Sequence, residues 1–139
     1  MQRPRKDLPP SVFISYNKAD ALIAKEIASF CALAGINVWF AEWKLSLGDS
    51  MIGRPSEGIG KCTHMILIWS KNAKKSRSVE IEYNSFLAKS LDRTDEKIIP
   101  VRLDKTPLPP ILLDKIYISY SKGAIHKIIE AITGLPTQP

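Results

Sequence analysis

The sequence contains no apolar run long enough to cross a membrane. Its longest uninterrupted apolar stretch, near Met65–Trp69, is far shorter than the roughly 20 residues that a bilayer requires. The basic residues at 1–6 are not followed by an apolar segment, so we expect no signal peptide. Contact with a membrane is therefore not expected.

Cysteine is also scarce, with Cys31 and Cys62 as its two occurrences. Two cysteines are too few for a disulfide scaffold or a cysteine-rich metal site. Both are expected to be buried or half-buried thiols in a reducing compartment, although one bridge between them stays open as an alternative. No Asn-x-Ser/Thr acceptor occurs either, and together these features favour a cytoplasmic location.

What the sequence does have is enough apolar surface to fold as one domain. Of its 139 residues, 45% are hydrophobic and 24% are charged. The formal net charge of +6 permits binding to anions, but the basic residues are scattered, apart from the run at 71–77. Because aromatic residues do not interleave with them, we expect a solvated cationic face and no direct contact with nucleic acid.

Hydrophobic periodicity predicts strands that alternate with helices. The expected strands are Ser11–Tyr16, Asn37–Ala41, His64–Ser70, Lys97–Leu103 and Lys115–Tyr120. The expected helices are Ala19–Ala34, Arg77–Leu91 and Ala124–Thr133, with a short or late-starting one near Pro55. This order indicates an α/β fold with a parallel sheet between two helical layers. We expect a leader at 1–10, one domain at 11–134 and a tail at 135–139.

In such open sheets, ligands bind beyond the carboxyl ends of the strands. The loop after the first expected strand has no glycine-rich dinucleotide motif, no P-loop and no acidic cluster typical of a phospho-receiver. A G-x-S-x-G nucleophile elbow is absent too. The two histidines, His64 and His126, are far apart in the sequence, and each is expected at a strand end or a surface. We therefore expect no metal site.

Two segments remain as carriers of chemistry, 41–50 and 76–86. The first is long for a strand-to-helix connection, and such loops are often functional, but loop length alone favours a surface loop anchored by packing of Trp43 and Leu45. The second places Glu80 and Glu82 on opposite flanks of an expected helix. Periodicity leaves open which carboxylate faces a cleft, and a solvated charge is the ordinary role of a helical glutamate.

The motifs SVFISY, VWFAEWKLSLGDS, SxSVxxE at Ser76–Glu82 and IIPVRLD, taken in this order, resemble a bacterial TIR domain. The resemblance extends over about Ser11–Thr133. It implies a flavodoxin-like three-layer sandwich with a five-stranded parallel sheet, in which 41–50 is the BB loop.

The family contains scaffolds, which assemble through TIR–TIR contacts, and enzymes, which cleave the nicotinamide–ribose bond of NAD. The resemblance implies an NAD glycohydrolase that acts in bacterial defence, takes NAD as its substrate and needs no cofactor. The products would be nicotinamide and either ADP-ribose or a cyclic form of it. The family's essential glutamate corresponds to Glu82, and the substrate-binding candidates are Tyr16, Trp43, Lys44 and Ser50.

Each substrate-binding candidate also has an ordinary structural explanation, such as packing for Tyr16, a solvated charge for Lys44 and a helix cap for Ser50. This sequence departs from the family pattern in three places. One is the helix after the BB loop, which contains Gly53, Pro55, Gly58 and Gly60 and is therefore expected to be short or to start late. The other two are single positions. Ser78 replaces the tryptophan four residues before the glutamate, and Ala41 replaces an aspartate, with Glu42 next to it. The consequences left open are weak catalysis, activity only after self-assembly, or a non-catalytic scaffold. A sensor domain or partner outside this chain is expected to trigger it.

Overall fold

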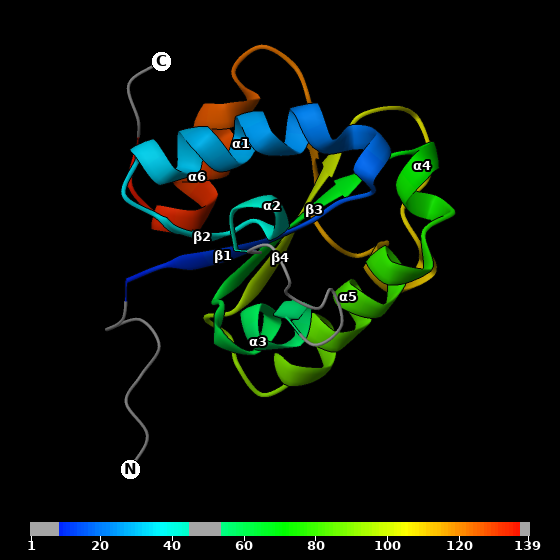
Figure 1. Ribbon diagram of the computed structural model, residues 1–139, viewed down its shortest axis with the longest axis horizontal. Helices are drawn as coiled ribbons and strands as arrows, with labels where there is room; N and C mark the ends of the chain where they lie inside the picture. Colours follow the sequence, from blue (N-terminus) through cyan, green and yellow to red (C-terminus); the bar gives the residue numbers. More distant parts are fainter. Residues whose placement is uncertain (1–8, 45–53, 137–139) are drawn as a thin grey trace.

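The computed structural model of the protein describes residues 9–44 and 54–136. Its centre is a five-stranded sheet with the order β2-β1-β3-β4-β5, in which every pair is parallel (Figure 1). The strands are β1 (Ser11–Ser15), β2 (Asn37–Trp39), β3 (His64–Trp69), β4 (Lys97–Arg102) and β5 (Ile118–Ser119). The expected α/β fold with a flavodoxin-like parallel sheet is therefore confirmed.

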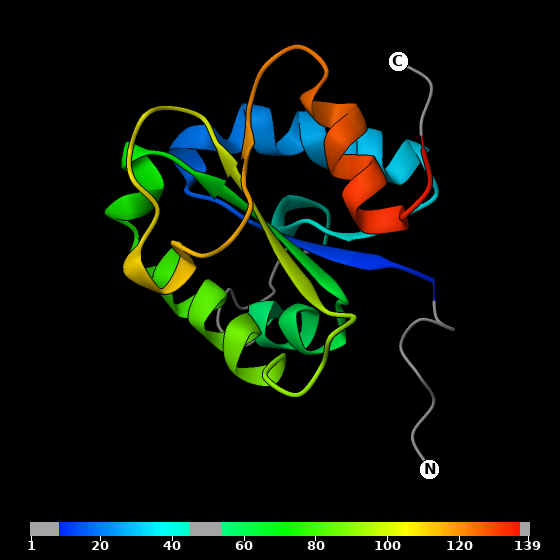
Figure 2. The ribbon, with the colours of Figure 1, turned by 180° about the vertical axis from the view of Figure 1, so that it is seen from behind.

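Helices cover both faces of this sheet. The helices are α1 (Ala21–Leu33), α2 (Ala41–Lys44), α3 (Arg54–Lys61), α4 (Lys71–Lys74), α5 (Arg77–Lys89) and α6 (Ala124–Thr133). Helices α1 and α6 lie on one face, and α3 and α5 lie on the other, as the front and back views show (Figures 1 and 2). None of the helices in the described ranges is long and apolar enough to span a membrane.

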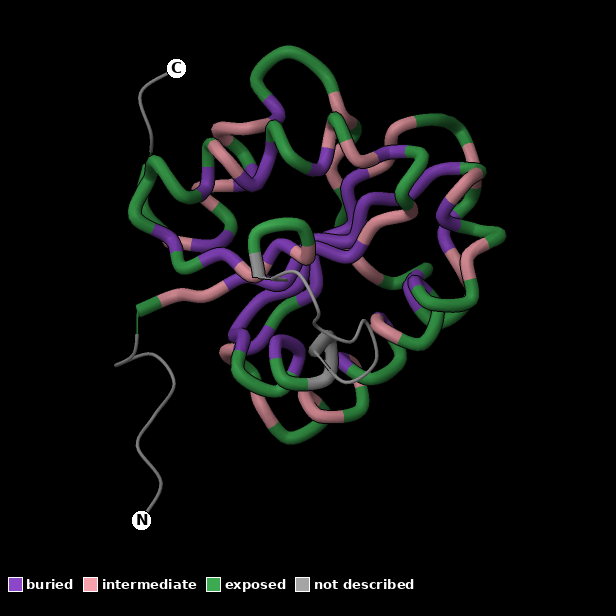
Figure 3. The backbone as a smooth tube through the Cα atoms, in the orientation of Figure 1, coloured by how far each residue is buried: buried purple, intermediate pink, exposed green. Residues whose placement is uncertain are grey.

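Each face has its own hydrophobic core, and the buried strands run between the two (Figure 3). In β1, Val12 and Ile14 pack towards α1 and α6, whereas Phe13 packs towards α3 and α5. All six residues of β3 are buried, as expected for a strand that is covered on both faces. The alternation along β1 directs Ser15, its last residue, to the same face as Phe13.

Several boundaries differ from the sequence prediction. The second strand ends at Trp39 instead of Ala41, because Trp43 N–H donates to the Phe40 carbonyl and this turn starts helix α2. The residues of α2 also favour helices. The last strand starts at Ile118 instead of Lys115, because Lys115 N–H bonds the Leu112 carbonyl and extends the 3-10 turn η3 (Pro110–Leu112).

Two further helices, α4 and α3, can be compared with the sequence prediction. The basic run after β3 forms α4, a helix that the sequence analysis missed, capped by Ser70. The helix that was expected to be short or to start late is α3, in which Pro55 occupies the first turn.

Pro100 lies inside β4, which has neighbours on both sides, although a proline in a sheet is usually confined to an edge strand or a bulge. Lys97 N–H and Leu103 N–H both donate to carbonyls on the β3 side. Because the donor direction alternates along a strand, the nitrogen of Pro100 faces β5 instead. The ladder with β5 begins only at Val101, so no partner on that side needs the missing N–H.

Helix α3 contains two glycines that should respond oppositely to alanine. A Cβ at Gly58 would lie within 2.6 Å of three Trp39 ring atoms, whereas a Cβ at Gly60 would meet nothing within 4 Å. We expect Gly58→Ala to lower the free energy of unfolding by about 2 kcal/mol, and Gly60→Ala to raise it by roughly 0.5–1 kcal/mol. Urea denaturation of the two variants measures this; equal effects would contradict the close packing of Gly58 on Trp39.

Candidate active site

The carboxyl end of β1 meets the middle of α5 through one short hydrogen bond. Ser76 caps α5 by accepting from Val79 N–H, and the buried face of the helix is formed by Val79, Tyr83 and Phe86. Glu82 is on the flank of this face that turns towards β1. The Ser15 hydroxyl donates to Glu82 Oε1 at 2.6 Å, and Ser15 itself is completely buried.

The Glu82 carboxyl is half-buried, and this changes its acidity. Burial raises its pKa from 4.5 to about 7, while the hydrogen bond from Ser15 acts in the opposite direction and favours the ionised form. The group therefore ionises much closer to neutral pH than an ordinary glutamate does. A carboxyl in this condition can carry a negative charge in a poorly solvated place, which is a common property of functional acids.

The two glutamates that periodicity did not distinguish have different surroundings. Glu80 is exposed to solvent, whereas Glu82 is half-buried against β1. The flank of α5 that carries Glu82 packs on the sheet because it adjoins Phe86, which is 1% exposed. Burial and hydrogen bonding thus single out Glu82 as the candidate catalytic residue.

Three aromatic rings form a row that begins at Tyr16, the residue after Ser15. Tyr16 directly follows β1 and stacks on Phe40 at 5.1 Å between ring centroids, with an interplanar angle of 24°. Trp43 in α2 contacts the same Phe40 ring edge-on, also at 5.1 Å, and remains 43% exposed. Phe40 is completely buried and fixes both neighbours. Tyr16 and Trp43, which were expected to bind substrate, therefore share one support.

Tyr16 connects the aromatic row to the acidic groups. Its pKa is raised to about 12, first by burial and then by the negative charges of Glu42 and Glu82. Both carboxylates thus act on the same hydroxyl, although Glu42 is exposed and belongs to α2. Because Tyr16 stays protonated at neutral pH, its hydroxyl can donate a hydrogen bond to a ligand.

The remaining predicted site residues are placed only in part. Lys44 is the last residue of α2, and its side chain lies outside the described part, as does Ser50. Ser78 is exposed in the first turn of α5, with its hydroxyl 3.1 Å from that of Ser76. Sequence reasoning overlooked Ser15 and Phe40; the signal for Ser15 was a polar residue at a position of β1 that faces the core.

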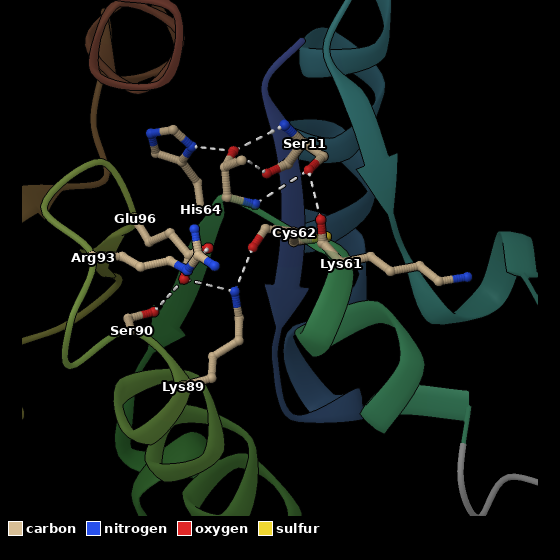
Figure 4. Close-up of polar contacts among 9 residues, drawn as sticks. Ser11, Lys61, Cys62, His64, Lys89, Ser90, Arg93 and Glu96 are labelled. Atoms are coloured by element: carbon tan, nitrogen blue, oxygen red, sulfur yellow. Dashed lines mark hydrogen bonds and ion pairs between the residues drawn. The ribbon is translucent and has the colours of Figure 1, made fainter. Parts of the chain in front are cut away.

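A second polar cluster lies at the opposite, amino-terminal edge of the sheet (Figure 4). There the Glu96 side chain is completely buried, and its Oε1 lies 2.8 Å from Lys89 Nζ and 2.9 Å from Ser90 Oγ. Lys89 Nζ also donates to the Cys62 carbonyl at 2.8 Å. These contacts tie the end of α5 to the starts of β3 and β4, which is a structural role.

His64 and the cysteines take no part in the Glu82 site. His64 starts β3 at the cluster just described, where burial and the charge of Lys97 lower its pKa to about 4. Both cysteines are buried, as expected, and no disulfide joins them within the described residues. Within residues 9–44 and 54–136, no group of three or more potential ligands is arranged to hold a metal ion.

Comparisons with known proteins agree with this architecture. The profile of a family described as "TIR domain" matches residues 12–132. The chain is 27% identical to a 2′ cyclic ADP-D-ribose synthase, BtTIR of Bacteroides thetaiotaomicron, over 129 residues, covering 88% of this chain and 45% of that protein. It is 26% identical to the NAD(+) hydrolase TcpA of a Theionarchaea archaeon over 127 residues, covering 87% of this chain and 38% of that protein.

Among solved structures, the TIR domain of the Toll-related receptor TRR-2 from Hydra magnipapillata superposes with a TM-score of 0.69 at 16% identity. The match covers 86% of this chain and 91% of that domain, and it shows the fold. The chain spans less than half the length of the two curated relatives, so those proteins contain further segments.

Proposed function

Because this chain belongs to the TIR domain family, we propose that it cleaves the nicotinamide–ribose bond of NAD, with Glu82 as the catalytic residue. The products would be nicotinamide and either ADP-ribose or a cyclic form of it. The observation that carries the proposal is the half-buried Glu82 carboxyl, hydrogen-bonded to the end of β1 beside Tyr16. Distant relatives named as an NAD(+) hydrolase and a cyclic ADP-ribose synthase support it.

One carboxylate is sufficient for this reaction. The nicotinamide of NAD carries a positive charge, so the electron pair of the breaking C1′–N bond neutralises the leaving group without a general acid. Positive charge then develops on the ribose ring, as in glycoside hydrolysis. An ionised Glu82 in a poorly solvated place stabilises that charge, and water, or a hydroxyl of the same molecule, completes the bond to C1′ and loses its proton.

The aromatic row would hold the rest of the substrate. Trp43 presents a half-exposed ring on which nicotinamide or adenine can stack. Tyr16 keeps its proton at neutral pH and can donate to a ribose or phosphate oxygen near Glu82. Lys44 and Ser50 remain candidates for the pyrophosphate, on the basis of the family resemblance alone.

The direct test is nicotinamide release from NAD, measured at increasing protein concentration. We expect the rate per molecule to rise with concentration, because we propose that self-association through TIR–TIR contacts completes or orders the site. A rate per molecule that stays constant would contradict activation by assembly. The absence of any release, in solutions where light scattering shows assembly, would contradict the enzymatic function.

A non-catalytic scaffold is the second candidate, and one observation favours it. A groove of about 820 Å³ lies between the end of α5 and the β4–β5 edge, and Glu82 does not line it. Leu91 and Ile116 line it and are 84% and 92% exposed. Exposed apolar side chains around a groove are typical of protein interaction surfaces. Assembly without nicotinamide release would favour this function.

A further inference from the structure

Ser15 is a buried polar residue where the strand pattern calls for an apolar one. Its side chain follows Phe13 on the α5 face of β1, and in the ladder it lies opposite Leu67 of β3. Both neighbours belong to the hydrophobic core on that face. A hydroxyl with no solvent exposure at such a place is costly unless it is hydrogen-bonded. Its partner is Glu82 Oε1, 67 residues later in the chain.

Within residues 9–44 and 54–136, the bond from Ser15 is the single hydrogen bond that the Glu82 carboxylate accepts. An ionised carboxylate offers two oxygens with about four acceptor positions. Ser15 donates its one proton to Oε1, so Oε2 has no protein donor in those residues. Ser15 thus ties Oε1 to the end of a strand inside the sheet, and among the described residues Oε2 is left without a donor.

We propose that Ser15 is a positioning residue, which holds Glu82 Oε1 in place and keeps the carboxylate ionised so that Oε2 faces the ribose of the substrate. This inference rests on the proposed NAD cleavage for its catalytic meaning. The contact itself has a physical consequence that is independent of any substrate, because a donor to the ionised form opposes the effect of burial.

The other ionisable groups at this corner are accounted for. Tyr16 at the end of β1 stays neutral up to about pH 12, and Glu42 in α2 is exposed and acts on Tyr16. On α5, Glu80 is exposed on the far flank. The pKa of Glu82 is set by burial and by the hydrogen bond from Ser15. Glu57 and Lys61 of α3 do not contribute to it.

The catalytic test is the pH profile of NAD cleavage by Ser15→Ala, which removes the hydroxyl at nearly constant volume. In the wild type, kcat should rise with pH through about 7, as Glu82 ionises. In Ser15→Ala, this rise should move upward by about one pH unit, so that kcat near pH 7 falls roughly five-fold and recovers towards pH 9. Ser15→Thr, which keeps the donor, should return the midpoint to its wild-type position. An unshifted midpoint in Ser15→Ala would overturn the proposal.

A second measurement needs no activity. Because the folded state holds the Glu82 proton up to about pH 7 and the unfolded state releases it near 4.5, stability should decline between these values. In Ser15→Ala the decline should continue by about one further pH unit. In a Glu82→Gln background, Ser15→Ala should lose this pH dependence.

The two measurements separate the two hypotheses. If the wild type releases no nicotinamide but the stability shift is found, NAD cleavage is wrong and the Ser15–Glu82 coupling holds. If Ser15→Ala has the same pH-dependent effect on stability with glutamate or glutamine at position 82, the coupling is wrong, whether or not NAD is cleaved.

Discussion

Replacing Glu82 by glutamine is expected to reduce nicotinamide release from NAD by at least about a hundred-fold. Glutamine has nearly the same shape and can still accept the hydrogen bond from Ser15, but it carries no charge to stabilise the developing positive ribose. The loss should therefore appear in kcat more than in KM. Release of nicotinamide, followed by chromatography at the concentration of greatest activity, measures it.

The matched control is Glu80→Gln on the same helix, where the carboxylate is exposed and the expected change is less than about two-fold. A folding defect can be excluded with the same variants. Since Glu82→Gln removes a charge that burial disfavours, it should stabilise the protein at pH 8 by about 2 kcal/mol, and by much less at pH 5. A Glu82→Gln variant that keeps full activity would show that the mechanism is wrong.

Replacing Glu96 by alanine is expected to lower the free energy of unfolding by about 3 kcal/mol, with a fall in Tm of about 10 °C. The carboxylate is completely buried and is held by Lys89 and Ser90, at 2.8 and 2.9 Å. Its removal leaves the Lys89 ammonium, whose side chain is only 20% exposed, without its anionic partner. Denaturant unfolding followed by circular dichroism measures the change.

Asp92→Ala is the control for this prediction, because Asp92 is an exposed acid in the same connection between α5 and β4. We expect it to change stability by less than about 0.5 kcal/mol. Since the cluster lies at the edge of the sheet opposite to Glu82, NAD cleavage per folded molecule should be unchanged in Glu96→Ala. A loss of stability no larger than that of Asp92→Ala would contradict the assigned structural role.

The sequence predicted the layers well because their signal is repeated along the chain. The buried run of β3 and the apolar spacing of α5 each recur over several residues, so single exceptions do not obscure them. Short elements lack this redundancy. Helix α4 has only four residues and depends on the Ser70 cap, and β5 is limited by a turn at Lys115, neither of which periodicity describes.

The candidate site was predictable only as far as it is local. Helical spacing placed Glu80 and Glu82 on opposite flanks of α5. The choice between them depends on packing against β1, where the partner of Glu82 is Ser15, 67 residues earlier in the chain. The role of Phe40 likewise depends on two rings that reach it from separate segments, those of Tyr16 and Trp43. Such contacts are made by tertiary structure, and no pattern within one segment encodes them.

The burial of Glu82 has opposite effects on protein stability and on the proposed reaction. The fold is most stable when this carboxyl holds its proton, whereas the proposed reaction needs it charged. Selection for heat resistance alone would therefore favour a neutral residue at position 82. The resulting variants would be more stable but would lack the charge that the proposed reaction needs. An engineer who wishes to make this domain more robust should seek gains elsewhere and exclude that position from any library.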